Sequence, residues 1–72
     1  MQKMKLKDIL KGKSQVYVAV YEKWNGVEIM QGGCFYVGNG KLVALDGYDY
    51  SLDMEVDNWL WNNTREVRVY VY

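Results

Sequence analysis

The sequence contains no histidine and no proline, and it has a single cysteine, Cys34. Without histidine the chain lacks the commonest general base and a frequent metal ligand. One cysteine cannot form an internal disulfide, which indicates a reducing compartment, and no neighbouring base would activate it. These absences argue against an enzyme, so we predict no catalytic residue and interpret Cys34 as a small buried apolar residue.

Long apolar runs are also missing. No stretch approaches the roughly 20 apolar residues that a membrane span requires, and the opening MQKMKLKDIL lacks the features of a secretory signal. We therefore expect a soluble, cytoplasmic protein with no membrane partner. The 72 residues, half of them apolar, suffice for one core, so residues 1–72 are expected to form a single domain.

Charge is balanced overall but segregated along the chain. Nine basic and nine acidic residues give a net charge of zero, which argues against a general nucleic-acid binder. Residues 1–13 hold five lysines against one acid, whereas residues 46–57 hold five acids and no base. The acidic stretch lacks the ligand spacing of a calcium loop, so no metal or cofactor is predicted.

Periodicity predicts one helix and several strands. Leu6, Ile9 and Leu10 recur at helical spacing before Gly12, which predicts a helix over residues 3–11. Valine and tyrosine then alternate in stretches such as QVYVAVY and VRVYVY, as in strands with two different faces. The predicted strands lie near residues 15–24, 27–31, 34–38, 41–46, 54–61 and 65–72.

Three asparagine-containing pairs predict hairpin turns, and each turn fixes a register. We expect Gly32-Gly33 to form a bulge or a bend. The fold class is predicted as α+β: a short N-terminal helix on a strongly bent, mainly antiparallel sheet of five to six strands, or a small barrel. The predicted pairs are Tyr21 with Met30 around Asn25-Gly26, Tyr36 with Val43 around Asn39-Gly40, and Val56 with Val69 around Asn62-Asn63.

These registers divide the strands into a core face and an outer face. The helix residues Leu6, Ile9 and Leu10 are expected to cap the core face. The predicted core residues of the strands are Val16, Val18, Val20, Trp24, Val27, Ile29, Met54, Val56, Leu60, Val67, Val69 and Val71. The predicted outer residues are Tyr17, Tyr21, Met30, Trp59, Trp61, Tyr70 and Tyr72.

The aromatic outer face has two interpretations. Tyrosine is common in strands and tolerates half exposure, so the face needs no partner. Alternatively it is an interface, because tyrosine and tryptophan are enriched at binding hot spots. Its partner would then be a second copy of the chain, another protein or nucleic-acid bases. The candidate partner-binding residues are Tyr48, Asp49, Asp53, Glu55, Asp57, Trp59, Trp61, Tyr70 and Tyr72.

The opening MKLKDILKGK, the alternating valine strands, the EV at 55–56 and the terminal VRVYVY give the chain a recognisable pattern. In this pattern it resembles small uncharacterised proteins encoded by prophages and mobile elements of Gram-positive bacteria. The resemblance implies a non-enzymatic inhibitor or adaptor, with anti-CRISPR proteins as one recurrent example. Such a protein would use the acidic and aromatic residues to occupy a basic groove of a host protein.

Two other functions remain open at this point. One helix and about five strands also fit nucleic-acid-binding small barrels of the Sm and SH3 types, in which aromatic residues stack on bases. The zero net charge disfavours that function. The other alternative is a subunit of a structural homo-oligomer, for example a homodimer joined through the aromatic face.

Overall fold

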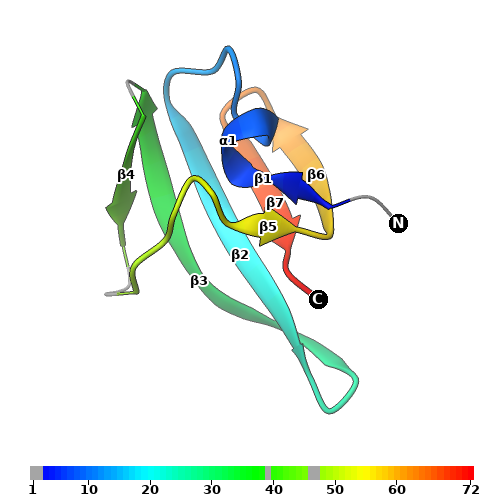
Figure 1. Ribbon diagram of the computed structural model, residues 1–72. Helices are drawn as coiled ribbons and strands as arrows, with labels where there is room; N and C mark the ends of the chain where they lie inside the picture. Colours follow the sequence, from blue (N-terminus) through cyan, green and yellow to red (C-terminus); the bar gives the residue numbers. More distant parts are fainter. Residues whose placement is uncertain (1–2, 39, 46–47) are drawn as a thin grey trace.

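The computed structural model describes residues 3–38, 40–45 and 48–72 (Figure 1). These residues form a five-stranded sheet of order β4-β3-β2-β7-β6 and a separate two-stranded sheet, β1-β5. Strands β2 and β7 are parallel, and every other pair is antiparallel. The elements are β1 (Met4–Lys5), α1 (Leu6–Ile9), β2 (Val16–Trp24), β3 (Val27–Gly38), β4 (Lys41–Ala44), β5 (Glu55–Val56), β6 (Asn58–Asn63) and β7 (Glu66–Tyr70).

The fold-class prediction is confirmed in part: a short N-terminal helix and a mainly antiparallel five-stranded sheet are present, but with so little helix the protein is mainly β rather than α+β. The predicted helix over residues 3–11 is reduced to the four residues of α1. Met4 and Lys5 instead pair with Val56 and Glu55, and the N–H of Leu6 donates to the carbonyl of Met54 at 2.9 Å. Backbone pairing with a distant segment therefore replaces the first turn of the predicted helix.

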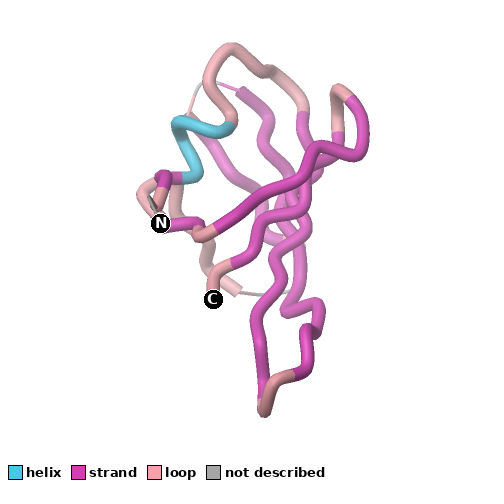
Figure 2. Tube along the Cα trace, turned by 90° about the vertical axis from the view of Figure 1, so that its right-hand side faces the viewer, coloured by secondary structure: helices cyan, strands magenta, loops and turns pink. Residues whose placement is uncertain are grey.

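The large sheet is covered on one face. In Figure 1, α1, β1 and β5 lie in front of β2 and β7, and Figure 2 shows the same elements on one side of the sheet. None of the described elements lies over the opposite face. The sheet is open at β4 and β6, so the described residues do not close into a barrel. The largest fully buried side chains are Leu6, Leu10, Val16, Val18, Val20, Cys34, Val56, Val67 and Val69.

The first hairpin confirms its predicted turn and register. Asn25 and Gly26 have φ values of 49° and 79°, as a turn with two left-handed residues requires, and Tyr21 pairs with Met30. The predicted irregularity near Gly32 is also present, because Val20 pairs with Gly32 and leaves Gln31 as an extra residue. The chain nevertheless continues through this bulge, so the two strands predicted at 27–31 and 34–38 are one strand, β3.

The tip of this hairpin extends beyond the covering layer (Figure 2). Trp24 and Val27 are 59% and 61% exposed, and Ile29 is also exposed. Their assignment to the core was therefore wrong. They lie on the same side of the sheet as the buried valines of β2, but α1 and β1 do not reach them.

The β6–β7 hairpin differs from its predicted register. Trp59, not Val56, pairs with Val69, and Asn63 pairs with Glu66. The Asn63 Oδ1 atom accepts the N–H of Arg65 at 2.7 Å, which stabilises a turn beyond Asn62-Asn63. A bulge between Trp61 and Asn63 makes the shift of the preceding residues three, an odd number, so the side chains from Asn58 to Trp61 change face.

This shift corrects three assignments. Trp59 and Trp61 were expected on the outer face, but they are half-buried and pack against the core cluster. Leu60 was expected in the core, but it is 54% exposed on the outer face. The predicted strand over residues 54–61 is also interrupted, since Val56 pairs with Met4 in β5 and a new strand begins at Asn58.

The β3–β4 hairpin is displaced by one residue. Gly38 pairs with Lys41, as a turn at 39–40 implies, but Tyr36 pairs with Leu42 instead of the predicted Val43. The register changes at a bulge between Tyr36 and Gly38, in which Val37 is the extra residue. Asn39 and Asp46, on which the predicted turn and the predicted end of the fourth strand depended, lie outside the described residues.

A charged side chain should destabilise the protein far more on the covered face of the large sheet than on its uncovered face. We expect Val69→Asp to unfold most of the protein, since an unpaired carboxylate in the core costs more than about 4 kcal/mol. We expect Leu60→Asp to change the free energy of unfolding by about 0.5 kcal/mol or less, because Leu60 is exposed. Urea melts monitored by circular dichroism measure both. Equal destabilisation by the two variants would contradict the observed β6 register.

Candidate binding surface

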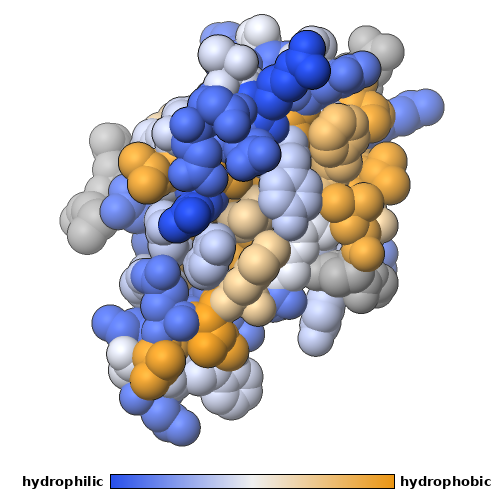
Figure 3. Space-filling view, turned by 180° about the vertical axis from the view of Figure 1, so that it is seen from behind, coloured by the Kyte–Doolittle hydropathy of each residue, from blue (hydrophilic) through white to orange (hydrophobic). Residues whose placement is uncertain are grey.

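The uncovered face of the large sheet, here called the outer face, carries five aromatic residues, of which Tyr72 is exposed and Tyr17, Tyr21, Phe35 and Tyr70 are half-buried. Its membership follows from the strand registers, because paired residues share a face. Figure 3 shows hydrophobic side chains gathered on the right of this face, over β3 and β4, and again at the lower left, near the hairpin tip. The outer-face residues include Tyr17, Tyr21, Lys23, Glu28, Met30, Phe35, Val43, Leu60, Glu66, Arg68, Tyr70 and Tyr72.

Three tyrosines form a continuous cluster across β2, β7 and the C-terminal segment. The ring centroids of Tyr21 and Tyr70 are 5.4 Å apart, and those of Tyr70 and Tyr72 are 5.9 Å apart at 74°. The Arg68 guanidinium lies 5.9 Å from the Tyr21 ring, and the Lys23 Nζ atom lies 5.4 Å from the Tyr72 ring. The cluster therefore already attracts two cations of the chain itself.

A pocket of about 390 Å³ opens beside this cluster. Tyr70 and Tyr72 supply aromatic rings, Glu28 and Asp57 supply carboxylates, and none of the lining residues is basic. The Asp57 side chain is only 21% exposed. The pocket is thus an aromatic site of negative charge. Its lining residues are Glu28, Asp57, Asn58, Trp59, Leu60, Tyr70 and Tyr72.

A side-chain hydrogen bond joins the C-terminal segment to the tip of the first hairpin. The Tyr72 hydroxyl donates to the Glu28 Oε2 atom at 2.5 Å. This bond, with smaller contributions from desolvation and from the negative charge of Glu28, raises the pKa of Tyr72 from 10.0 to about 12. Tyr72 therefore remains a neutral donor throughout the physiological range, and it fixes the position of Glu28 at the pocket wall.

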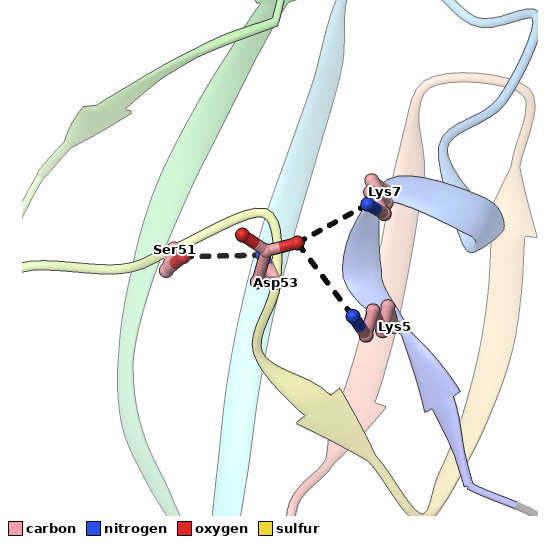
Figure 4. Close-up of polar contacts among 4 residues, drawn as sticks. All are labelled: Lys5, Lys7, Ser51 and Asp53. Carbon is pink, nitrogen blue, oxygen red and sulfur yellow. Dashed lines mark hydrogen bonds and ion pairs between the residues drawn. The ribbon is translucent and has the colours of Figure 1, made fainter.

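The acidic stretch between residues 53 and 57 faces the N-terminal lysines. The Asp53 Oδ1 atom lies 3.2 Å from Lys7 Nζ and 4.0 Å from Lys5 Nζ (Figure 4). Asp53 is further held by its N–H, which donates to Ser51 Oγ at 3.1 Å. The two segregated charge blocks of the sequence therefore meet across the β1-β5 pair.

Lys3 extends this pattern of ion pairs. Its Nζ atom lies 3.9 Å from Glu55 Oε2 and 3.6 Å from Asp57 Oδ1. Asp57 is the less exposed of the two acids, so its pair with Lys3 is less screened by solvent. Asp57 thus connects the ion pairs of the covering layer to the pocket.

The nine residues predicted to bind a partner separate into two groups. Asp57, Trp59, Tyr70 and Tyr72 meet in the pocket. The others lie elsewhere. Tyr48 and Asp49 are exposed in the segment before β5, Asp53 and Glu55 face the lysines, and Trp61 lies under Lys13 Nζ at 4.8 Å.

Three pocket residues, Glu28, Asn58 and Leu60, were not among the predicted site residues. The register predicted around Asn25-Gly26 implies that Glu28 stands opposite Lys23, as it does, but gives no indication of a site. Nothing in the sequence indicated that β7 pairs with β2, and this pairing brings Tyr72 beside Glu28. Leu60 was not predicted as a site residue because the predicted register of β6 placed its side chain in the core. The alternation of Leu60 with Trp59 and Trp61 was the available signal, but it fits either face.

Some other kinds of site are absent from the part of the chain that the structure describes. No group of three or more acidic or cysteine side chains is placed to hold a metal ion. None of the helices described has the length and apolar character to cross a bilayer. Searches with family models, against curated proteins and against solved structures each gave no match. The geometry of the outer face is therefore the basis for a functional proposal.

The ion pairs of Asp53 should contribute little to stability. We expect Asp53→Asn to lower the free energy of unfolding by less than about 1 kcal/mol, because the carboxylate is 71% exposed. In about 1 M salt, where the screening length is about 3 Å, the loss should shrink towards zero. Asp49→Asn is the control, since no ion pair of Asp49 occurs among the described residues. An equal loss in both variants would show that the pairs to Lys5 and Lys7 add nothing.

Tyr72 should ionise only at a pH well above the ordinary tyrosine pKa of 10.0. Because its pKa in the folded state exceeds the unfolded value, the contribution of its hydrogen bond is complete below pH 10 and is lost as the pH rises towards 12. NMR titration of the tyrosine rings measures this directly. Glu28→Gln should move the Tyr72 pKa back towards 10.0, whereas Glu66→Gln should leave it unchanged. An unshifted Tyr72 in the wild-type protein would contradict the observed contact.

Proposed function

We propose that the protein is a non-enzymatic binding module that captures a basic side chain of another protein in the pocket lined by β6, the C-terminal tyrosines and Glu28 of the first hairpin. One observation carries this proposal. Aromatic rings and two carboxylates line a single open pocket, and no basic residue lines it. Aromatic faces and carboxylates together are the groups that recognise a guanidinium or an ammonium ion.

The chain's own cations support this chemistry. Arg68 and Lys23 already lie within 6 Å of tyrosine rings beside the pocket. The Lys3 Nζ atom lies 3.6 Å from Oδ1 of Asp57, which lines the pocket. An incoming arginine would compete with Lys3 for Asp57, and its planar guanidinium would pack on Tyr70 more favourably than an ammonium ion.

The resemblance to prophage and mobile-element proteins gives this module a role as an inhibitor or adaptor that occupies a basic groove of a host protein. Asp49, Asp53 and Glu55 would then act at a distance, as exposed charges that accelerate the encounter. Tyr70 and Tyr72 would supply the desolvated contacts that hold the complex. Trp61 has no part in this mechanism, since it packs against the core.

A specific observation also favours a nucleic-acid ligand, namely the row of tyrosines with Arg68 on an open sheet. Bases stack on such rows in single-strand binding proteins. The two pocket carboxylates oppose it, because they repel phosphates, and the net charge is zero. We therefore favour the protein ligand, and the experiment below includes an oligonucleotide.

The proposal is tested by NMR titration with N-acetylarginine amide as the probe. The amides of the pocket residues should shift, with a Kd on the order of millimolar for so small a ligand. The uncharged citrulline analogue should bind at least tenfold more weakly. Combining Tyr70→Leu with Asp57→Asn should weaken arginine binding by roughly tenfold, since a tenfold change corresponds to about 1.4 kcal/mol.

The matched control combines Tyr48→Leu with Asp49→Asn, an aromatic and acidic pair outside the pocket lining. It should bind the probe as the wild-type protein does. Equal shifts with the arginine and citrulline compounds would overturn the proposal. Stronger shifts of the tyrosine row with a thymidine oligonucleotide at low salt would favour the nucleic-acid function instead.

A further inference from the structure

Strand β6 is an edge of the large sheet, and its sequence carries none of the usual protection of an edge. In the described part of the chain no strand pairs with its outer side. Its six residues, NWLWNN, contain no charge and no proline. Native edge strands are commonly blunted by lysine, proline or extreme shortness, and the opposite edge, β4, is short and begins with Lys41.

The backbone hydrogen bonds around β7 show which backbone groups of β6 face outward. The N–H of Val71 donates to the carbonyl of Tyr21, so the odd-numbered residues of β7 direct their backbone groups at β2. Arg68 therefore directs its groups at β6, where Leu60 is its partner. By alternation, the N–H and C=O groups of Trp59 and Trp61 point to the open side.

The contact made by Trp59 agrees with this direction. Its N–H donates to the Oδ1 atom of Asn58 at 2.9 Å, a side-chain acceptor, although its pairing partner across the hairpin is Val69. The Asn58 side chain thus accepts the hydrogen bond of the Trp59 N–H, a donor that would otherwise be available to a further strand. An amide side chain on an exposed edge can be displaced by a backbone carbonyl.

Residues 58–62 read NWLWN, which is the same in both directions around Leu60. In an antiparallel pair centred on Leu60, each residue meets a residue of its own kind. Trp59 meets Trp61, Asn58 meets Asn62, and Leu60 meets Leu60. This symmetry is a property of the sequence, and it coincides with the open edge found in the structure.

We propose that β6 pairs antiparallel with β6 of a second copy of the chain, with the twofold axis at Leu60. The outward N–H and C=O groups of Trp59 would bond those of Trp61 in the second copy, and the reverse pair would form by symmetry. The two five-stranded sheets would then become one sheet of ten strands. The outer faces of both copies would lie on the same side.

The side chains of β6 are compatible with pairing to β6 of a second copy. Leu60, which is 54% exposed, would cover Leu60 of the second copy on the outer face. Trp59 and Trp61 would form cross-strand aromatic pairs on the core side, and Asn58 and Asn62 would exchange amide hydrogen bonds. Since the strand has no charge, the two copies meet without repulsion, and a partner selected by charge has nothing to recognise on β6.

Cysteine cross-linking tests this pairing. In the proposed dimer the Cα atoms at position 60 form a non-hydrogen-bonded pair about 4.5 Å apart, within the range that a disulfide spans. Leu60→Cys should therefore oxidise to a covalent dimer at micromolar protein. Val43→Cys is the matched control, because Val43 is similarly exposed, at 48%, on the outer face of the other edge strand. The native Cys34 is buried in both variants.

A second variant tests the dimer without oxidation. Leu60→Lys places two like charges opposite each other, and it should weaken the dimer at least tenfold in sedimentation velocity while the melting curve remains cooperative. Val43→Lys and the pocket variant Tyr70→Leu should sediment as the wild-type protein does. Cross-linking of Leu60→Cys no faster than that of Val43→Cys, or a wild-type monomer at millimolar concentration, would overturn the proposal.

Discussion

The dominant constraint on this protein is the amount of chain available to cover its sheet. Five strands present two faces, and one helical turn with the β1-β5 pair is the only layer that the described residues place against them. Backbone bonds to residues 52 and 54 and lysine–carboxylate pairs hold this layer together, and its apolar side chains, such as Leu6 and Val56, pack on the valines of the sheet. It buries the valine face, and the tyrosine face is left to solvent. Tyrosine suits such a face, because its ring packs on neighbouring rings while its hydroxyl remains hydrated.

The pocket and the edge of β6 are neighbours on this open face, and they share Leu60. Pairing of two copies at β6 would place two pockets on one continuous surface, close to the twofold axis. A partner with two basic side chains at the matching separation would then bind both pockets. The second contact would be intramolecular, so that weak individual sites would suffice for firm binding.

The parts of the fold that were predicted correctly depend on local chemistry. Asn25-Gly26 fixed the first hairpin because both residues accept positive φ, and the valine alternation in β2 and β7 identified most of the buried residues. The turn predicted at Asn62-Asn63 was wrong because Asn63 stabilises a turn through its side chain, two residues beyond that site. A bulge between Trp61 and Asn63 then made the register shift odd, which reversed the faces of both tryptophans and Leu60. The pocket was only half predicted, since Glu28 and Tyr72 meet through a pairing between distant segments.

That long-range pairing between β2 and β7 has a consequence for the order of folding. Tyr17 pairs with Glu66, whereas Trp24 pairs with Val27 across a two-residue turn. Local hairpins form within about 1–10 μs, but parallel contacts between segments far apart in the chain require a large loss of loop entropy and form later. Both hairpins can therefore exist before they join. The tyrosine cluster and the pocket span their junction, so the surface that binds would be assembled last during folding.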